Sequence, residues 1–222
     1  MPQPPRPDGA PDNPVPVHSV QEEYFYLMVR RCACGGPWAP TGQTVERSGD
    51  RIVHHVPVRC AACGQERVVR FALEAPARRD PAPVREINPT AEPSRALDAA
   101  EWMDLARFYL ERIERLKEPT ERTQSLLDAR GCLGEALKFY GPGDGGPPPE
   151  ALWSEQSRAK VADRPDTYRR ATLEAMLAKV PPEERLRQAD APEERELRKA
   201  LQETARRRVG RRWWEFWKRG KN

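Results

Sequence analysis

Two close pairs of cysteines constrain the fold of this chain more than any other feature. Cys32 and Cys34 stand one residue apart in "RRCACGGPWAP", and Cys60 and Cys63 stand two residues apart in "VRCAACGQER". Two short thiolate pairs, delivered by separate turns, supply the four tetrahedral ligands of a structural metal site with little backbone strain. The spacing therefore predicts that the four sulfurs meet around one zinc ion.

The residues around each pair support this prediction. A glycine follows each second cysteine and can adopt the positive φ that turns backbone amides toward the sulfurs. The short apolar runs "EYFYLMV", "RIVHHVPV" and "ERVVRFAL" flank the pairs and predict strands. In these features residues 20–75 resemble the zinc-ribbon family, small β modules with two knuckles that each donate a cysteine pair. The resemblance implies one structural Zn²⁺ held by Cys32, Cys34, Cys60 and Cys63, although the first knuckle is shorter than the commoner C-x-x-C.

An iron–sulfur cluster and a redox dithiol are the alternatives that the four thiols leave open. His54 and His55 precede the second pair, but alternation along a strand turns them to opposite faces, so we interpret both as ordinary strand residues. Cys132 stands alone in an apolar helical segment, which predicts a small buried packing residue.

Composition predicts small folded units joined by disordered segments. The 222 residues include 24 Pro and 14 Gly, 32% are charged, and the mean hydropathy is -0.84, which leaves little material for a large core. We expect an α+β chain in which a small β ribbon precedes a separate helical bundle. The expected parts are a disordered Pro-rich arm (1–19), the ribbon (20–75), a linker (76–93), a helical domain (94–180) and a charged helix with an aromatic, basic tail (181–222).

The expected helical domain begins at Ser94, a plausible N-cap, and its apolar residues recur every three or four positions as far as Leu116. A second periodic stretch from about 120 to 140 completes an antiparallel hairpin. Stretches near 151–161 and 166–180 can close a small bundle. A ribbon followed by such a hairpin loosely resembles uncharacterised bacterial zinc-ribbon proteins, and that resemblance implies no activity.

The C-terminal segment predicts an amphipathic helix that is aromatic on one face and basic on the other. Three docking sites are open to this helix: the protein's own helices, an anionic membrane surface, or another protein or a nucleic acid. Its candidate contact residues are Arg207, Arg208, Arg211, Arg212, Trp213, Trp214, Phe216, Trp217, Lys218 and Arg219.

The sequence favours a non-enzymatic interaction or adaptor protein with a protein partner. It shows no Ser/His/Asp constellation and no phosphate-binding loop, and none of its three histidines stands beside an obvious acid in the sequence. The start of the chain reads as neither a signal nor an anchor, so we expect a cytoplasmic protein, peripheral at a membrane if the tail binds there. The alternatives are a membrane-surface scaffold and a nucleic-acid-associated regulator, the latter weakened because the positive charge is confined to the tail.

Overall fold

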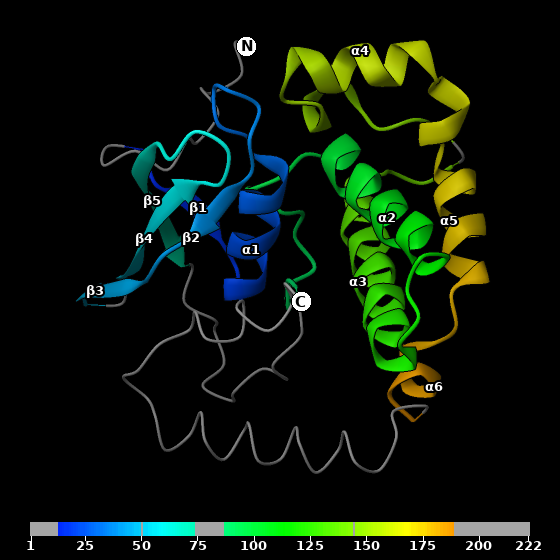
Figure 1. Ribbon diagram of the computed structural model, residues 1–222. Coiled ribbons are helices and arrows are strands. Elements are labelled where there is room, and N and C mark those ends of the chain that lie inside the picture. The colour runs from blue at the N-terminus through cyan, green and yellow to red at the C-terminus, as the bar shows by residue number, and fades with distance from the viewer. Residues whose placement is uncertain (1–12, 50, 74–86, 144, 189–222) are drawn as a thin grey trace.

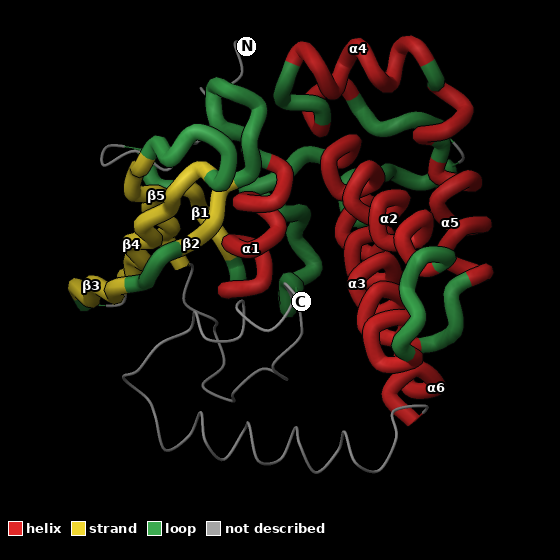
Figure 2. The backbone as a smooth tube through the Cα atoms, in the orientation of Figure 1, coloured by secondary structure: helices red, strands yellow, loops and turns green. Residues whose placement is uncertain are grey.

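A computed structural model describes residues 13–49, 51–73, 87–143 and 145–188. The fold is mixed α+β, with a five-stranded sheet and a set of helices beside it (Figure 1). Figure 2 shows that α1 lies between the sheet and the remaining helices. The elements are, in order, β1 (Val15–Val17), α1 (Val20–Val29), β2 (Trp38–Pro40), β3 (Thr44–Ser48), β4 (Arg51–Cys60), β5 (Glu66–Leu73), α2 (Ala99–Ile113), α3 (Pro119–Leu137), α4 (Glu155–Asp163), α5 (Arg170–Lys179) and α6 (Glu183–Gln188), with short 3-10 turns η1 (Pro149–Ala151) and η2 (Pro165–Tyr168).

The sheet has β4 at its centre. The strand order is β1-β5-β4-β2, and β3 pairs with the other end of β4. β1 runs parallel to β5, and the remaining pairs are antiparallel. Alternate residues of β4, namely Val56, Val58 and Cys60, are buried, as expected for a sheet with one covered face. The β4 and β5 runs were predicted as strands, and this prediction is confirmed.

The prediction of a strand in "EYFYLMV" was wrong, because these residues form most of α1. The Ser19 hydroxyl accepts hydrogen bonds from the backbone N–H groups of Gln21 and Glu22 and so caps the helix. α1 is buried on two sides: the Tyr26 ring packs edge-on against Phe71 of the sheet, and Phe25 packs on the other side. A helix covered on both sides has few polar positions, so its sequence resembles that of a buried strand.

The predicted disordered arm extended to residue 19, but the structure places a strand inside it. Val15 and Val17 of β1 are fully buried and lie opposite Phe71 and Leu73 of β5. Since β1 pairs with a strand more than fifty residues away in sequence, tertiary contacts order this short segment, which its own composition does not.

The predicted helical hairpin is present as α2 and α3. α2 begins later than predicted, because Asp98 forms a capping box with Glu101 and thereby replaces Ser94 as the N-cap. Pro119, three residues after the last apolar position of the first predicted helix, is the first residue of α3. Cys132 is fully buried in α3, which confirms its predicted packing role.

The sheet and the hairpin share one hydrophobic core, although the sequence predicted separate units. Phe25 of α1 makes edge-on ring contacts with Trp102 and Tyr109 of α2. Arg30, which ends α1, makes an ion pair with Glu101 at 2.7 Å. Ile87, in the predicted linker, is buried on α3 so closely that a Cβ at Gly131 would lie 2.5 Å from its Cδ1. Residues 87–93 of this linker, which the structure describes, therefore contribute to the core.

A buried carboxyl group lies on α3, close to α1. Glu135 accepts hydrogen bonds from Lys138 Nζ at 2.7 Å and from Asn88 Nδ2 at 3.3 Å. The pKa of Glu135 is raised to about 7, because burial and the nearby charge of Glu22 outweigh the lowering effect of Lys138.

Glu135 gives folding a pH dependence. Between its ordinary pKa of 4.5 and about 7, the folded chain holds a proton that the unfolded chain has lost. The free energy of unfolding therefore falls as the pH rises, by about 1.4 kcal/mol per pH unit across this interval. The contribution of Glu135 to the free energy of unfolding is complete below the pKa of the unfolded chain and is lost as the pH rises through the pKa of the folded chain. Its total is on the order of 3 kcal/mol.

The Glu135→Gln variant, which cannot titrate, is expected to show a flatter pH dependence of stability than the native chain. Urea unfolding measured between about pH 5.5 and 8 checks this. Glu111→Gln, at an exposed position of α2, is the matched control and should keep the native slope. Equal slopes for the Glu135→Gln variant and the native chain would contradict the assignment.

Candidate metal centre

The structure brings the four predicted ligands together. Cys32 and Cys34 lie in the loop between α1 and β2, while Cys60 ends β4 and Cys63 lies in the turn before β5. All four Sγ atoms lie within 4.8 Å of one another. The Sγ atoms of Cys32 and Cys63 are 3.7 Å apart, and those of Cys34 and Cys60 are 3.5 Å apart. The four cysteines are free thiols.

These separations fit a metal ion better than a pair of disulfides. A disulfide holds its sulfurs about 2 Å apart. A tetrahedral zinc ion with Zn–S bonds of about 2.3 Å separates its sulfurs by about 3.8 Å. The two contact distances of 3.7 and 3.5 Å lie close to the second value. Within the described residues, this is the one group of His, Cys, Asp or Glu side chains whose ligand atoms converge in this way.

The two knuckles are built alike, but the first is one residue tighter. The N–H of Gly35 donates to Cys32 O, three residues back, and the N–H of Gly64 donates to Cys60 O, four residues back. Gly35 has φ 83° and Gly64 has φ 76°, values that a residue with a side chain rarely adopts. The prediction that these glycines turn the chain through positive φ is confirmed.

Polar groups around Cys60 favour the thiolate form that a metal requires. Hydrogen bonds from the backbone N–H groups of Cys63 and Ala62 lower the pKa of Cys60 to about 6. At Cys32 the thiol donates a hydrogen bond to Gln65 Oε1 at 3.2 Å.

Gly36 is required for the close approach of the knuckles. A Cβ at this position would lie 2.7 Å from Cys60 Sγ and 2.6 Å from the Ala62 Cβ. Gly36→Ala is therefore expected to push the second knuckle away and weaken zinc binding by roughly tenfold or more, as loss of support around a metal does. Competition with a chromophoric chelator measures the affinity. Gly42→Ala is the matched control, since its nearest neighbour would be Pro57 at 3.9 Å; equal affinities would contradict this role.

The histidines have acidic neighbours in the fold that their positions in the sequence do not reveal. His54 Nδ1 lies 2.6 Å from Glu23 Oε1, in a buried contact that joins β4 to α1. His18 Nδ1 lies 3.2 Å from Glu22 Oε2 within one turn, and the more exposed His55 lies 2.9 Å from Glu46. The predicted alternation of His54 and His55 is confirmed. The contact of His54 with Glu23 links β4 to α1, and that of His55 with Glu46 links β4 to β3.

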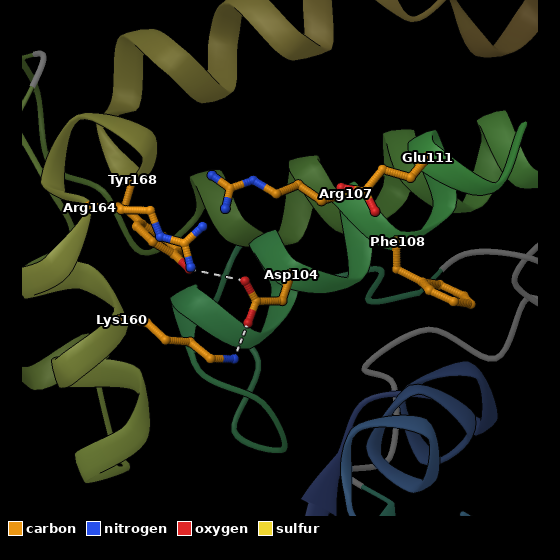
Figure 3. Close-up of a pocket in the computed structure, with 7 residues that line it drawn as sticks. All are labelled: Asp104, Arg107, Phe108, Glu111, Lys160, Arg164 and Tyr168. Carbon is orange, nitrogen blue, oxygen red and sulfur yellow. Dashed lines mark hydrogen bonds and ion pairs between the residues drawn. The ribbon is translucent and has the colours of Figure 1, made fainter. Parts of the chain in front are cut away.

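A polar pocket with a volume of about 290 Å³ lies between α2 and the α4–η2 segment (Figure 3). Asp104 accepts hydrogen bonds from Lys160 Nζ at 2.5 Å and from the Tyr168 hydroxyl at 3.0 Å. The Arg107 guanidinium lies over the Tyr168 ring, 4.9 Å from its centroid, and donates to Thr167 O. These groups satisfy one another across more than fifty residues of sequence, so we interpret the pocket as a structural joint between α2 and α4.

The predicted tail from Arg207 to Arg219 lies outside the described residues. Among the helices that the structure describes, none has both the length and the apolar character needed to cross a bilayer. Comparison with models of known protein families, with curated proteins and with solved structures gave no match.

Proposed function

We propose that this chain is a non-enzymatic interaction protein whose sheet is stabilised by one structural zinc ion in a ribbon-like site. The observation that carries the proposal is the convergence of four cysteine Sγ atoms within 4.8 Å. A site with four thiolate ligands has no open position for water or substrate, which favours a structural role over catalysis.

The site differs from the resembled ribbon in its first half. A helix, α1, precedes the first knuckle, and the strand pairing there is reduced to a single bridge between Arg31 and Pro37. The second knuckle joins the long antiparallel strands β4 and β5. We therefore assign the ribbon-like role to this second hairpin, on which the first knuckle closes.

A closed structural site can be distinguished from a catalytic one by replacing zinc with Co²⁺ in the full chain. We expect the absorption spectrum of tetrahedral cobalt with thiolate ligands, and we expect azide to leave it unchanged. A spectrum that shifts when azide is added would reveal an open coordination position and would count against the structural role.

The outer face of the β4–β5 hairpin is the surface that we propose for a protein partner. Val68 is 49% exposed on this face, opposite Pro57 of β4. Val45, also 49% exposed, lies opposite His54 of β4 and therefore on the other face of the sheet, so it is not part of this surface. An exposed apolar residue beside a strand edge suits contact with another chain.

Capture experiments with the full zinc-loaded chain test this surface. Val68→Arg should remove partners that the native chain retains, because it replaces the exposed apolar side chain with a charge. Arg115→Glu, at an exposed position beyond α2, should retain them. Identical capture by the native chain and the Val68→Arg variant would show that this face is not the binding surface.

A further inference from the structure

The four sulfurs form two pairs, and each pair combines an exposed cysteine with a buried one. Cys63 is exposed and its Sγ lies 3.7 Å from that of buried Cys32. Cys34 is exposed and its Sγ lies 3.5 Å from that of buried Cys60. Both pairs join the first knuckle to the second, so each contact runs between segments that are distant in sequence.

This arrangement has a chemical consequence. A thiol bound to a metal is deprotonated, and the thiolate is the form of cysteine that attacks oxidants. An accessible thiolate is oxidised reversibly when a second thiol stands close enough to resolve the sulfenic acid as a disulfide. Cys63 and Cys34 are exposed and so accessible to an oxidant. Cys32 and Cys60 lie close enough to them to act as the resolving thiols.

We propose that the cysteine centre is a peroxide-reactive site, in which Cys34 and Cys63 are oxidised first and Cys60 and Cys32 resolve them. Two disulfides, Cys32–Cys63 and Cys34–Cys60, then replace the metal as the links between the knuckles. This inference rests on the proposed zinc site and adds to it the class of small molecule that acts there, a hydroperoxide.

In each pair, the exposed thiolate attacks one peroxide oxygen and the O–O bond breaks. The sulfur keeps that oxygen as a sulfenic acid, and the other oxygen leaves as hydroxide and is protonated to water. The buried thiolate then attacks the sulfenic sulfur, forms the S–S bond and displaces a second hydroxide, which also becomes water. The two pairs together supply four electrons, consume two peroxides and four protons, yield four waters, and release Zn²⁺.

The backbone around the knuckles would preserve their alignment during this exchange. The N–H of Ala61 donates to Pro37 O at 2.9 Å, and Trp38 of β2 lies opposite Cys60 of β4. These contacts hold the two segments together independently of the sulfurs. Oxidation should therefore release the metal and keep the sheet, whereas chelation under reducing conditions removes the metal and leaves no cross-link.

The experiment uses the full chain, with its zinc content measured first and hydrogen peroxide then added in steps. A chromogenic zinc indicator follows metal release, and dimedone added at partial oxidation traps sulfenic acids. Non-reducing tryptic maps with fragmentation sequencing identify the disulfides, since peptides 32–47 and 60–67 each carry one knuckle. Cys132→Ser is the matched control, because Cys132 is fully buried and its loss should leave the peroxide stoichiometry and the disulfide map unchanged.

We expect complete zinc release at two peroxides per chain, dimedone adducts at Cys34 or Cys63, and joined peptides with the 32–63 and 34–60 pairing. Disulfides within a single knuckle, sulfinic acids in place of disulfides, or zinc retained in excess peroxide would overturn this inference and leave a measured zinc site standing. A chain that contains no zinc at the start would overturn the proposed zinc site itself, and its disulfide map would still test the pairing.

Discussion

Chelation of the metal from the reduced protein is expected to lower the melting temperature of the whole chain by roughly 10 °C or more. The knuckles contain few apolar side chains, and the four thiolates repel one another once the metal has left, so the metal should supply much of the local stability. Because α1 joins the sheet to the hairpin through Tyr26 and Phe25, a loss of stability in the sheet should also destabilise the helices. Thermal melts followed by circular dichroism, with and without a chelator, measure the effect.

Two controls make this prediction specific. The Cys60→Ser, Cys63→Ser double variant should melt at the lower temperature with or without the chelator. Adding zinc back should restore the melting temperature of the native chain and leave that of the double variant unchanged. A melting temperature that is indifferent to the chelator in the native chain would mean that the metal contributes nothing to stability.

Trp102→Ala is expected to destabilise the chain by about 3–5 kcal/mol, the range for removal of a buried aromatic side chain. Trp102 is fully buried and its ring lies 5.4 Å from that of Phe25, so the variant opens a cavity where α1 meets α2. Phe108→Ala on the same helix is the matched control, since Phe108 is 47% exposed and its loss should cost about 0.5 kcal/mol or less.

Urea unfolding followed by both helix and sheet signals gives a second readout for the Trp102→Ala variant. A shared core requires both signals to shift together. If the helical signal alone moved, the sheet and the hairpin would be separate folding units, as the sequence predicted, and the shared core would be contradicted.

Local signals allowed several elements to be predicted from the sequence. The knuckles follow from cysteine and glycine spacing within a few residues, so Gly35 and Gly64 have the expected positive φ. The hairpin follows from apolar periodicity, and apolar residues of the two periodic stretches, among them Trp102, Leu133 and Ala136, are buried.

α1 was mispredicted for a reason that lies in its surroundings. It packs between the sheet and α2, so its apolar residues follow neither a strand nor a helix pattern clearly. One signal for the helix was present, since Ser19 and Glu22 have the spacing of a capping box. Ser19 does cap the helix, while Glu22 accepts a hydrogen bond from the N–H of His18.

Long-range contacts explain the rest of what could not be predicted. β1 has three residues and forms because β5 offers it a parallel partner. The pairing of His54 with Glu23 and the contact of Asp104 with Lys160 bring together residues far apart in the chain, and no local pattern encodes them. The same holds for the pairing of exposed with buried sulfurs, which depends on how the two knuckles meet.

The most direct test of the account is the metal content and metal environment of protein purified under reducing conditions. We expect one zinc ion per chain, with an X-ray absorption spectrum that shows four sulfur neighbours at about 2.3 Å. The Cys60→Ser, Cys63→Ser variant should contain none. A native chain without zinc, or a double variant with unchanged zinc content, would contradict the assignment of Cys32, Cys34, Cys60 and Cys63 as a zinc site.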